Sequence, residues 1–168
     1  MAIAVAIGSL LIVAGVATYL TSTARGTLAI RIHDAPASWS HVTVTFSQIA
    51  IHRADAANGS GWIQLNLSLT QIDFLAPGNL TRLLALDRVT PGTYTQLRII
   101  VSSVQGVLSG GAPVTMSVPD GVIKTTTPFT VRGGGTTTVT LDLDLANSIH
   151  QANGQWMFRP VLGSISVA

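Results

Sequence analysis

The sequence contains no cysteine and no glutamate, and Lys124 is its single lysine. Without cysteine the chain forms no disulfide and offers no thiolate to a metal. Charged residues make up 10% of the 168 residues, whereas soluble proteins average about 25%. The formal net charge of +2 reflects scattered arginines without a basic cluster, which argues against a nucleic-acid partner. A hydrophobic content of 47% excludes a disordered tail.

The first 24 residues carry no charge, and Arg25 is the first charged residue. As a helix this segment would span roughly 36 Å, enough to cross a bilayer. A secretory signal peptide fits poorly, because no Lys or Arg precedes the apolar run. A permanent anchor is the simpler alternative, but a positive flank at Arg25 favours a cytoplasmic location for the domain that follows. A third interpretation is an exported chain from which a short basic leader has been removed.

This third arrangement resembles type IV pilins, and archaeal pilins in particular, whose exposed hydrophobic helices bundle into a filament core. The resemblance implies a helical homopolymer on the cell surface, with a membrane-inserted stage before assembly. Bacterial type IV pilins carry Glu at the fifth mature position, where this sequence has Val5, which favours the archaeal branch. Small residues in the segment would let helices approach closely. The predicted polymerisation surface of helix 1–25 comprises Ala4, Val5, Gly8, Leu11, Ile12, Gly15 and Tyr19.

From Gly26 onward the hydrophobic period changes to two, which predicts β-strands. A slip of phase near Ser47 predicts a β-bulge, and Asn153-Gly154 predicts a turn. Only Leu80–Leu86 suggests a short helix. The residues expected to point inward are Leu28, Ile30 and Ile32 in a first strand, and Leu97, Ile99 and Val101 in a later one, where Gln96 and Arg98 point outward.

Many short strands separated by Gly- and Pro-containing turns predict the fold class. It is mainly β: a long N-terminal hydrophobic α-helix over residues 1–25, followed by one antiparallel immunoglobulin-like or Greek-key β-sandwich over residues 26–168.

The β part is also similar to an uncharacterised family of extracellular β-sandwich modules, known as a domain of unknown function. The similarity rests on residues 26–36, 42–52, 61–62, 91–103, 129–131, 135–144 and 158–161. The block that begins Pro91-Gly-Thr-Tyr is fairly specific. The family implies the fold and an extracellular location, and supplies no activity and no catalytic residue. Its members often follow a lipobox cysteine, which this chain lacks, so its attachment must differ.

Few residues suggest chemistry. Asp142 and Asp144 alternate with leucines and are predicted to share one outward face, about 7 Å apart. Such a pair suits half of a Ca²⁺ site or a glycosidase pair, but a solvated strand face is the simpler interpretation. The four histidines lack ligand spacing. The sequence therefore predicts no enzyme, no cofactor and no bound metal.

The remaining signals concern the surface. Asn58, Asn66 and Asn79 begin N-x-S/T sequons, which are candidate glycosylation sites. The sequence favours a pilin, a structural subunit of an extracellular filament with a role in adhesion. One alternative is a membrane-anchored extracellular module that binds a glycan or protein partner through strand edges or through Trp39, Trp62 and Trp156 as a sugar platform, although core or edge packing is the simpler interpretation of these tryptophans. The other is a filament assembled by strand donation.

Overall fold

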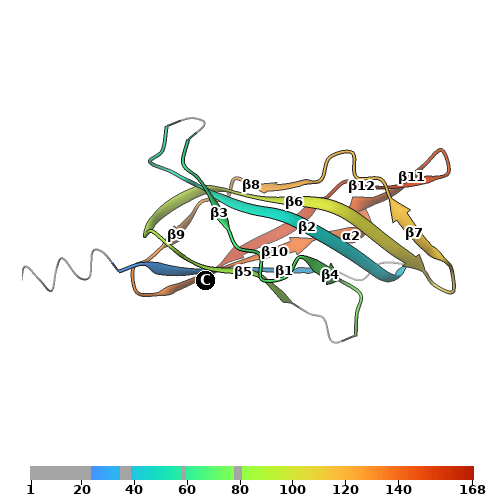
Figure 1. Cartoon of the computed structure of the whole chain (residues 1–168), viewed down its shortest axis with the longest axis horizontal. Coiled ribbons are helices and arrows are strands. Elements are labelled where there is room, and N and C mark those ends of the chain that lie inside the picture. The colour runs from blue at the N-terminus through green and yellow to red at the C-terminus, as the bar shows by residue number, and fades with distance from the viewer. Residues whose placement is uncertain (1–23, 35–38, 58–59, 78–80) are drawn as a thin grey trace, which may run out of the picture.

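Alternating apolar residues organise the chain into two facing β-sheets, seen in this computed structural model (Figure 1). The structure describes residues 24–34, 39–57, 60–77 and 81–168. Sheet A has the spatial order β13-β10-β1-β5. Its strands are β1 (Gly26–Asp34), β5 (Arg82–Val89), β10 (Thr136–Leu143) and β13 (Leu162–Val167).

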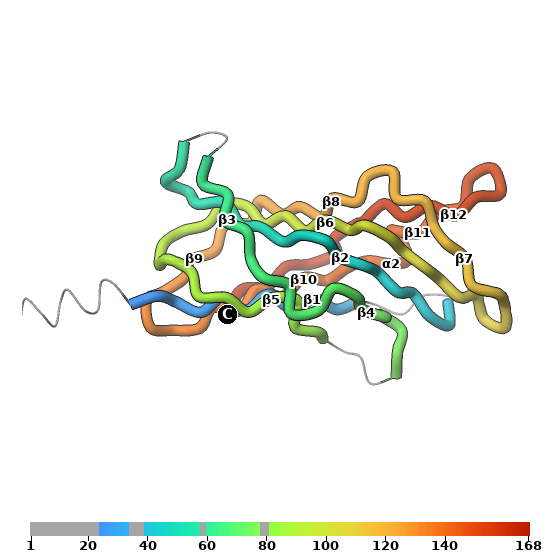
Figure 2. The backbone as a smooth tube through the Cα atoms, viewed as in Figure 1, coloured from blue at the N-terminus to red at the C-terminus, as the bar shows by residue number. Residues whose placement is uncertain are grey.

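Sheet B is built around β2 (Trp39–Arg53) and β6 (Gly92–Leu108), two long antiparallel strands that lie side by side along most of the domain (Figure 2). β3 (Trp62–Leu65) and β4 (Gln71–Asp73) pair with the outer edge of β2. Three strands pair with the outer edge of β6: β7 (Pro113–Met116), β8 (Val122–Thr125) and β9 (Phe129–Val131). The register of β2 against β6 shifts between Phe46 and Gln48, which confirms the bulge predicted near Ser47.

A small hairpin of β11 (Ile149–Ala152) and β12 (Gln155–Phe158) follows the four-residue helix α2 (Leu145–Ser148). Its two-residue turn has φ of 50° at Asn153 and 76° at Gly154. Positive φ at both positions matches the twist of an antiparallel hairpin, and the predicted turn is confirmed.

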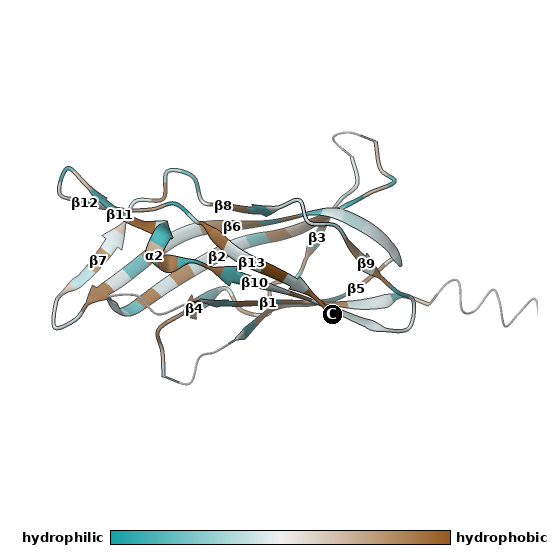
Figure 3. Cartoon of the chain, turned by 180° about the vertical axis from the view of Figure 1, so that it is seen from behind, coloured by the Kyte–Doolittle hydropathy of each residue, from teal (hydrophilic) through white to brown (hydrophobic). Residues whose placement is uncertain are grey.

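The core fills the space between the two sheets. Both sheets contribute to one buried cluster, in which Leu28, Ile30 and Ile32 of β1 are 0% exposed. Leu97, Ile99 and Val101 of β6 are at most 4% exposed, so both predicted inward sets are confirmed. Figure 3 shows the resulting alternation of apolar and polar bands along β2 and β6. The opposite face of β6 carries partly or fully exposed side chains, among them Gln96 and Arg98, as predicted.

The predicted fold class is wrong in two respects. First, the part of the chain that the structure describes holds no long apolar helix, and α2 is its single helix. No helix within that part has the length and hydrophobicity to span a membrane. Residues 1–23, to which the long helix was assigned, lie outside the described residues, and Ala24 and Arg25 are not helical.

Second, sheet A is mixed rather than antiparallel, because β1 and β10 are parallel from Thr27↔Thr136 to Asp34↔Leu143. These strands lie far apart in sequence and share no hairpin, so no local turn fixes their relative direction. The predicted helix at Leu80–Leu86 is also wrong, since Arg82–Val89 form β5. Pairing with β1 and burial of Leu84 and Ala85 outweigh the helix propensity of this leucine-rich segment.

Candidate functional site

The predicted polymerisation residues Ala4, Val5, Gly8, Leu11, Ile12, Gly15 and Tyr19 lie outside the described residues, as do Asn58 and Asn79. Asn66 is exposed just after β3. Its Nδ2 atom donates to Asp87 Oδ1 at 3.1 Å, and its backbone N–H donates to Oδ2 of the same carboxylate. The Asn66 sequon thus lies on the surface, with its amide nitrogen already hydrogen-bonded.

Asp142 and Asp144 each have a partner of their own. Asp142 lies on β10 beside His33, with Oδ1 3.5 Å from His33 Nδ1. Asp144 lies beyond the end of β10 and is the N-cap of α2. Its carboxylate accepts hydrogen bonds from the side chain and backbone of Asn147, which lower the pKa of Asp144. Among the described residues no three His or Asp side chains gather as a metal site.

The tryptophans fall into two separate places rather than one platform. Trp39 and Trp156 meet edge to face, with ring centroids 4.8 Å apart. Trp62 pairs with His52 near the other end of β2, roughly 40 Å away along an extended strand. A three-tryptophan sugar platform is therefore wrong, and each place is a separate candidate.

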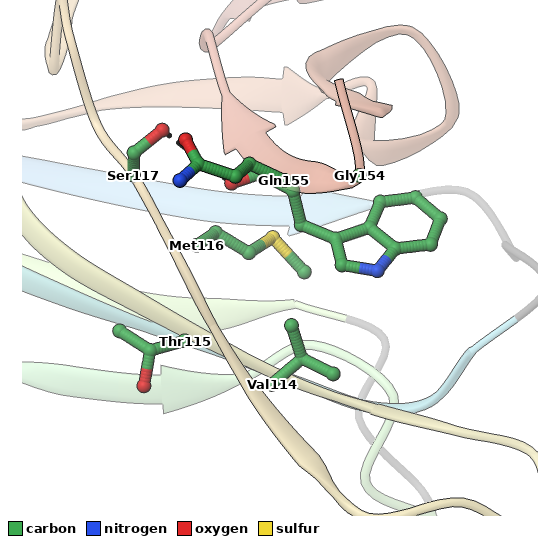
Figure 4. Close-up of a pocket in the computed structure, with 7 residues that line it drawn as sticks. Val114, Thr115, Met116, Ser117, Gly154 and Gln155 are labelled. Carbon is green, nitrogen blue, oxygen red and sulfur yellow. Dashed lines mark hydrogen bonds between the residues drawn. The ribbon is translucent and has the colours of Figure 1, made fainter. Parts of the chain in front are cut away.

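Beside Trp156 lies a groove of about 440 Å³ between β7 and β12 (Figure 4). Backbone hydrogen bonds between Ser117 and the strand of Trp156 and Phe158 tie these segments together. The groove is lined by Val114, Thr115, Met116, Ser117, Gly154, Gln155 and Trp156. None of these side chains is charged, so the groove offers no group for acid–base chemistry.

The second candidate is the outer face of sheet B between β3 and β8. The strand register places one row of side chains across four strands: Gln64, Ala50, Arg98 and Lys124. Trp62, His52 and Gln96 form the next row. We call the whole surface the Arg98 face; it comprises Gln48, Ala50, His52, Trp62, Gln64, Gln96, Arg98, Ile100, Val122 and Lys124.

Arg98 and Trp62 form the centre of the Arg98 face. The guanidinium carbon of Arg98 lies 4.3 Å from the centroid of the Trp62 ring, within cation–π range. Because Trp62 is two strands away from Arg98, the arginine reaches it across β2, on which its register partner is the small residue Ala50. His52 meets the same indole edge to face, with centroids 5.1 Å apart. The indole thus holds both polar neighbours in place.

Two nitrogen atoms at this centre are buried without a hydrogen-bond partner, Arg98 Nε and His52 Nδ1. Buried polar atoms are usually paired, and an unpaired one costs about 1–3 kcal/mol. These two nitrogens therefore contribute no hydrogen bond to the fold within the described residues.

No carboxylate of the described side chains neutralises the Arg98 face. Asp55 lies in the loop beside it, but the Arg53 guanidinium binds that carboxylate at 2.6 and 2.8 Å and lowers its pKa. The other described carboxylates are engaged elsewhere: Asp142 with His33, Asp73 with His41, Asp87 with Asn66, Asp120 with the Val122 N–H, and Asp144 at α2. Arg98 and Lys124 are thus left without an ionic partner among them.

Sequence reasoning placed Gln96 and Arg98 on an outward face but did not connect them with Trp62 or Lys124. These residues come from three strands, and only the register of β3 and β8 against the central pair brings them together. In the sequence, the features that could have indicated this face were the alternate, outward-facing residues of β6 and the single lysine of the chain.

Residues 25–160 match the sequence model of a family described as a domain of unknown function, DUF4382. A solved structure of a candidate cell adhesion protein from Bacteroides ovatus is similar at 9% identity, with a TM-score of 0.31. That similarity covers 84% of this chain and 44% of the other, so this chain spans less than half of its length. No curated protein matches the sequence.

Proposed function

We propose a binding function for this chain, which belongs to the DUF4382 family: a non-catalytic module of the cell surface that attaches to glycans through its Arg98 face. The observation that carries the proposal is the composition of that face. It combines a tryptophan, three glutamines and two cations with no carboxylate.

These side chains suit a sugar polymer. A glutamine amide both donates and accepts hydrogen bonds, as a sugar hydroxyl does. The partly exposed indole of Trp62 supplies apolar surface together with a polar N–H. The three glutamines, Gln48, Gln64 and Gln96, spread over adjacent strands of a sheet face, an arrangement that fits an extended chain better than a small molecule.

A non-catalytic role is proposed because the described acidic groups do not converge. General acid–base chemistry needs two groups within reach of one substrate. Asp142 and Asp144, the pair expected from sequence, serve a histidine contact and a helix cap instead. An extracellular location is part of the proposal, supported by the three sequons.

The test is retention of the full chain, kept in mild detergent, on immobilised polysaccharides. Trp62→Ala and Gln96→Ala should each weaken binding several-fold, because each removes a contact of the Arg98 face. The matched control is Gln105→Ala, which removes an exposed glutamine from the other end of β6 and should leave binding unchanged. Retention that is insensitive to both face variants, or retention by protein partners alone, would refute the proposal.

A second candidate is a subunit of an extracellular filament whose partner is the chain itself. The observation that favours it is the uncharged run of residues 1–24, of which residues 1–23 lie outside the described residues. Electron microscopy of protein sheared from the native cell surface without detergent tests it. Filaments that disappear when residues 1–24 are deleted would support this candidate, and protein that stays in the membrane fraction would exclude it.

A further inference from the structure

We infer that the ligand of the Arg98 face is an acidic saccharide, whose carboxylate binds the guanidinium of Arg98 and the ammonium of Lys124. This inference rests on the proposed function and adds the chemical class of the sugar. It follows from the charges, the fixed position of Arg98 and the neutral groups around it.

The charge argument concerns two neighbouring cations. Arg98 on β6 and Lys124 on β8 are directly opposite in register and lie on the same outward face. Like charges opposite each other on adjacent strands destabilise a sheet. Since the described carboxylates are engaged elsewhere, the fold does not neutralise this pair. An anion bound above the two residues would do so.

The position of Arg98 is fixed before any ligand arrives. Its guanidinium lies over Trp62 at 4.3 Å, whereas a free arginine would sample many rotamers. Ordering a long side chain on binding costs conformational entropy, and the contact with Trp62 has already met this cost. Among the described residues, no hydrogen bond from this guanidinium is found, and since Nε is buried, its terminal nitrogens are the donors left for a ligand. A guanidinium with free donors matches the two oxygens of a carboxylate.

Lys124 adds a mobile second cation. It is exposed on a short edge strand, and among the described residues it has no ion pair. Its flexible stem lets the ammonium reach an anion held by Arg98. The pairing of one fixed and one mobile cation fits a ligand that carries single carboxylates at intervals.

The neutral groups favour a sugar over other anions. Nucleic acids are held by many phosphate contacts from Lys and Arg, and the Arg98 face has two such residues. Gln64 and Gln96 flank the cations on neighbouring positions and suit hydroxyl groups. A uronic acid presents both a carboxylate and hydroxyls on one ring, so the same residues would contact both.

The experiment measures affinity of the full chain in mild detergent for three soluble polymers. Polygalacturonate carries a carboxylate on each sugar, a neutral galactan carries none, and dextran sulfate carries charge without carboxylate. We expect the tightest binding to polygalacturonate, with a loss of about tenfold or more for Arg98→Gln and a smaller loss for Lys124→Gln. Arg132→Gln, which removes an exposed arginine at the far side of β9, should change little.

A second measurement uses the single lysine. Polygalacturonate should protect Lys124 from acetylation by an N-hydroxysuccinimide ester, as read by mass spectrometry of its peptide, and galactan should not. Equal affinity for galactan and polygalacturonate, with Gln96→Ala still weakening both, would overturn the acidic sugar while leaving the proposed function intact. Binding to dextran sulfate as tight as to polygalacturonate would reduce the inference to charge alone and overturn it. Binding to no glycan would refute both.

Discussion

Replacing Tyr94 by Phe isolates one buried hydroxyl group of the core. Tyr94 is 0% exposed, and its hydroxyl donates to the Thr90 carbonyl at 2.6 Å across the β5–β6 turn. The ring stacks on Phe129 with centroids 5.5 Å apart, a contact that Phe retains. The substitution therefore removes the hydrogen bond and leaves a carbonyl without this partner while the packing stays the same.

The expected loss is about 1–2 kcal/mol, the net value of a buried hydrogen bond with one partner left unsatisfied. For a domain of this size it corresponds to a fall in Tm of roughly 2–8 °C. Thermal and urea unfolding at neutral pH, followed by circular dichroism, measure both quantities. The urea m-value should not change, because the same surface is exposed on unfolding. A Tm within 1 °C of the unchanged protein, a margin of roughly a quarter to a half of a kcal/mol, would refute the reasoning.

The same variant tests a pH effect. Burial raises the pKa of Tyr94 above its ordinary value, and the nearby Arg53 opposes this only in part. Above about pH 10 the tyrosine ionises in the unfolded chain before it ionises in the folded one, so the native protein loses stability as pH rises. Tyr94→Phe lacks this loss, and the stability gap between the two proteins should narrow from pH 10 upward. A gap that stays constant to about pH 11.5 would contradict the assignment.

Two further predictions concern backbone geometry and a helix cap. A Cβ at Gly121 would lie 2.3 Å from the Val101 carbonyl oxygen, so Gly121→Ala should destabilise the protein by about 1–3 kcal/mol. The control is Gly135→Ala, which should not destabilise it because nothing lies within 4 Å of a Cβ there. Scanning fluorimetry compares the Tm of the two variants. Asp144→Ala should lower Tm at neutral pH by removing the cap of α2, and Asp144→Asn should not. Hydrogen bonds from Asn147 lower the pKa of Asp144 in the folded protein. The stability that this carboxylate contributes is therefore present above about pH 4 and is lost as the pH falls through the folded pKa. Unfolding curves between pH 2 and pH 7 measure this loss, and equal curves for Asp144→Ala and the unchanged protein would contradict it.

Local physics explains what could be read from the sequence. Period-two alternation fixes which face of a strand is buried, so the inward positions of Leu97, Ile99 and Val101 followed directly. The Asn153-Gly154 turn followed from the same kind of rule, because few residues adopt positive φ. Neither inference needed the partner strand.

Pairing between strands far apart in the sequence explains which features of the fold could not be predicted. The parallel contact of β1 with β10 depends on strands that no hairpin connects. Asp144 continued the alternation of β10 on paper, but the strand ends at Leu143 and the carboxylate caps a helix instead. The leucines of β5 resemble a helix until β1 supplies an edge for them to pair with.

The Arg98 face also depends on pairing between distant strands, and its residues can be replaced without disturbing the core. Its ten side chains point away from the core, so the packing that holds β2 and β6 together does not depend on them. Ala50 differs from the other nine residues, because we expect its small size to leave room for Arg98 to reach Trp62 across β2. A larger side chain there would displace the guanidinium from the indole without removing a charge or a core contact. Binding that depends on Arg98 should therefore depend on Ala50 as well, whereas binding through charge alone should not.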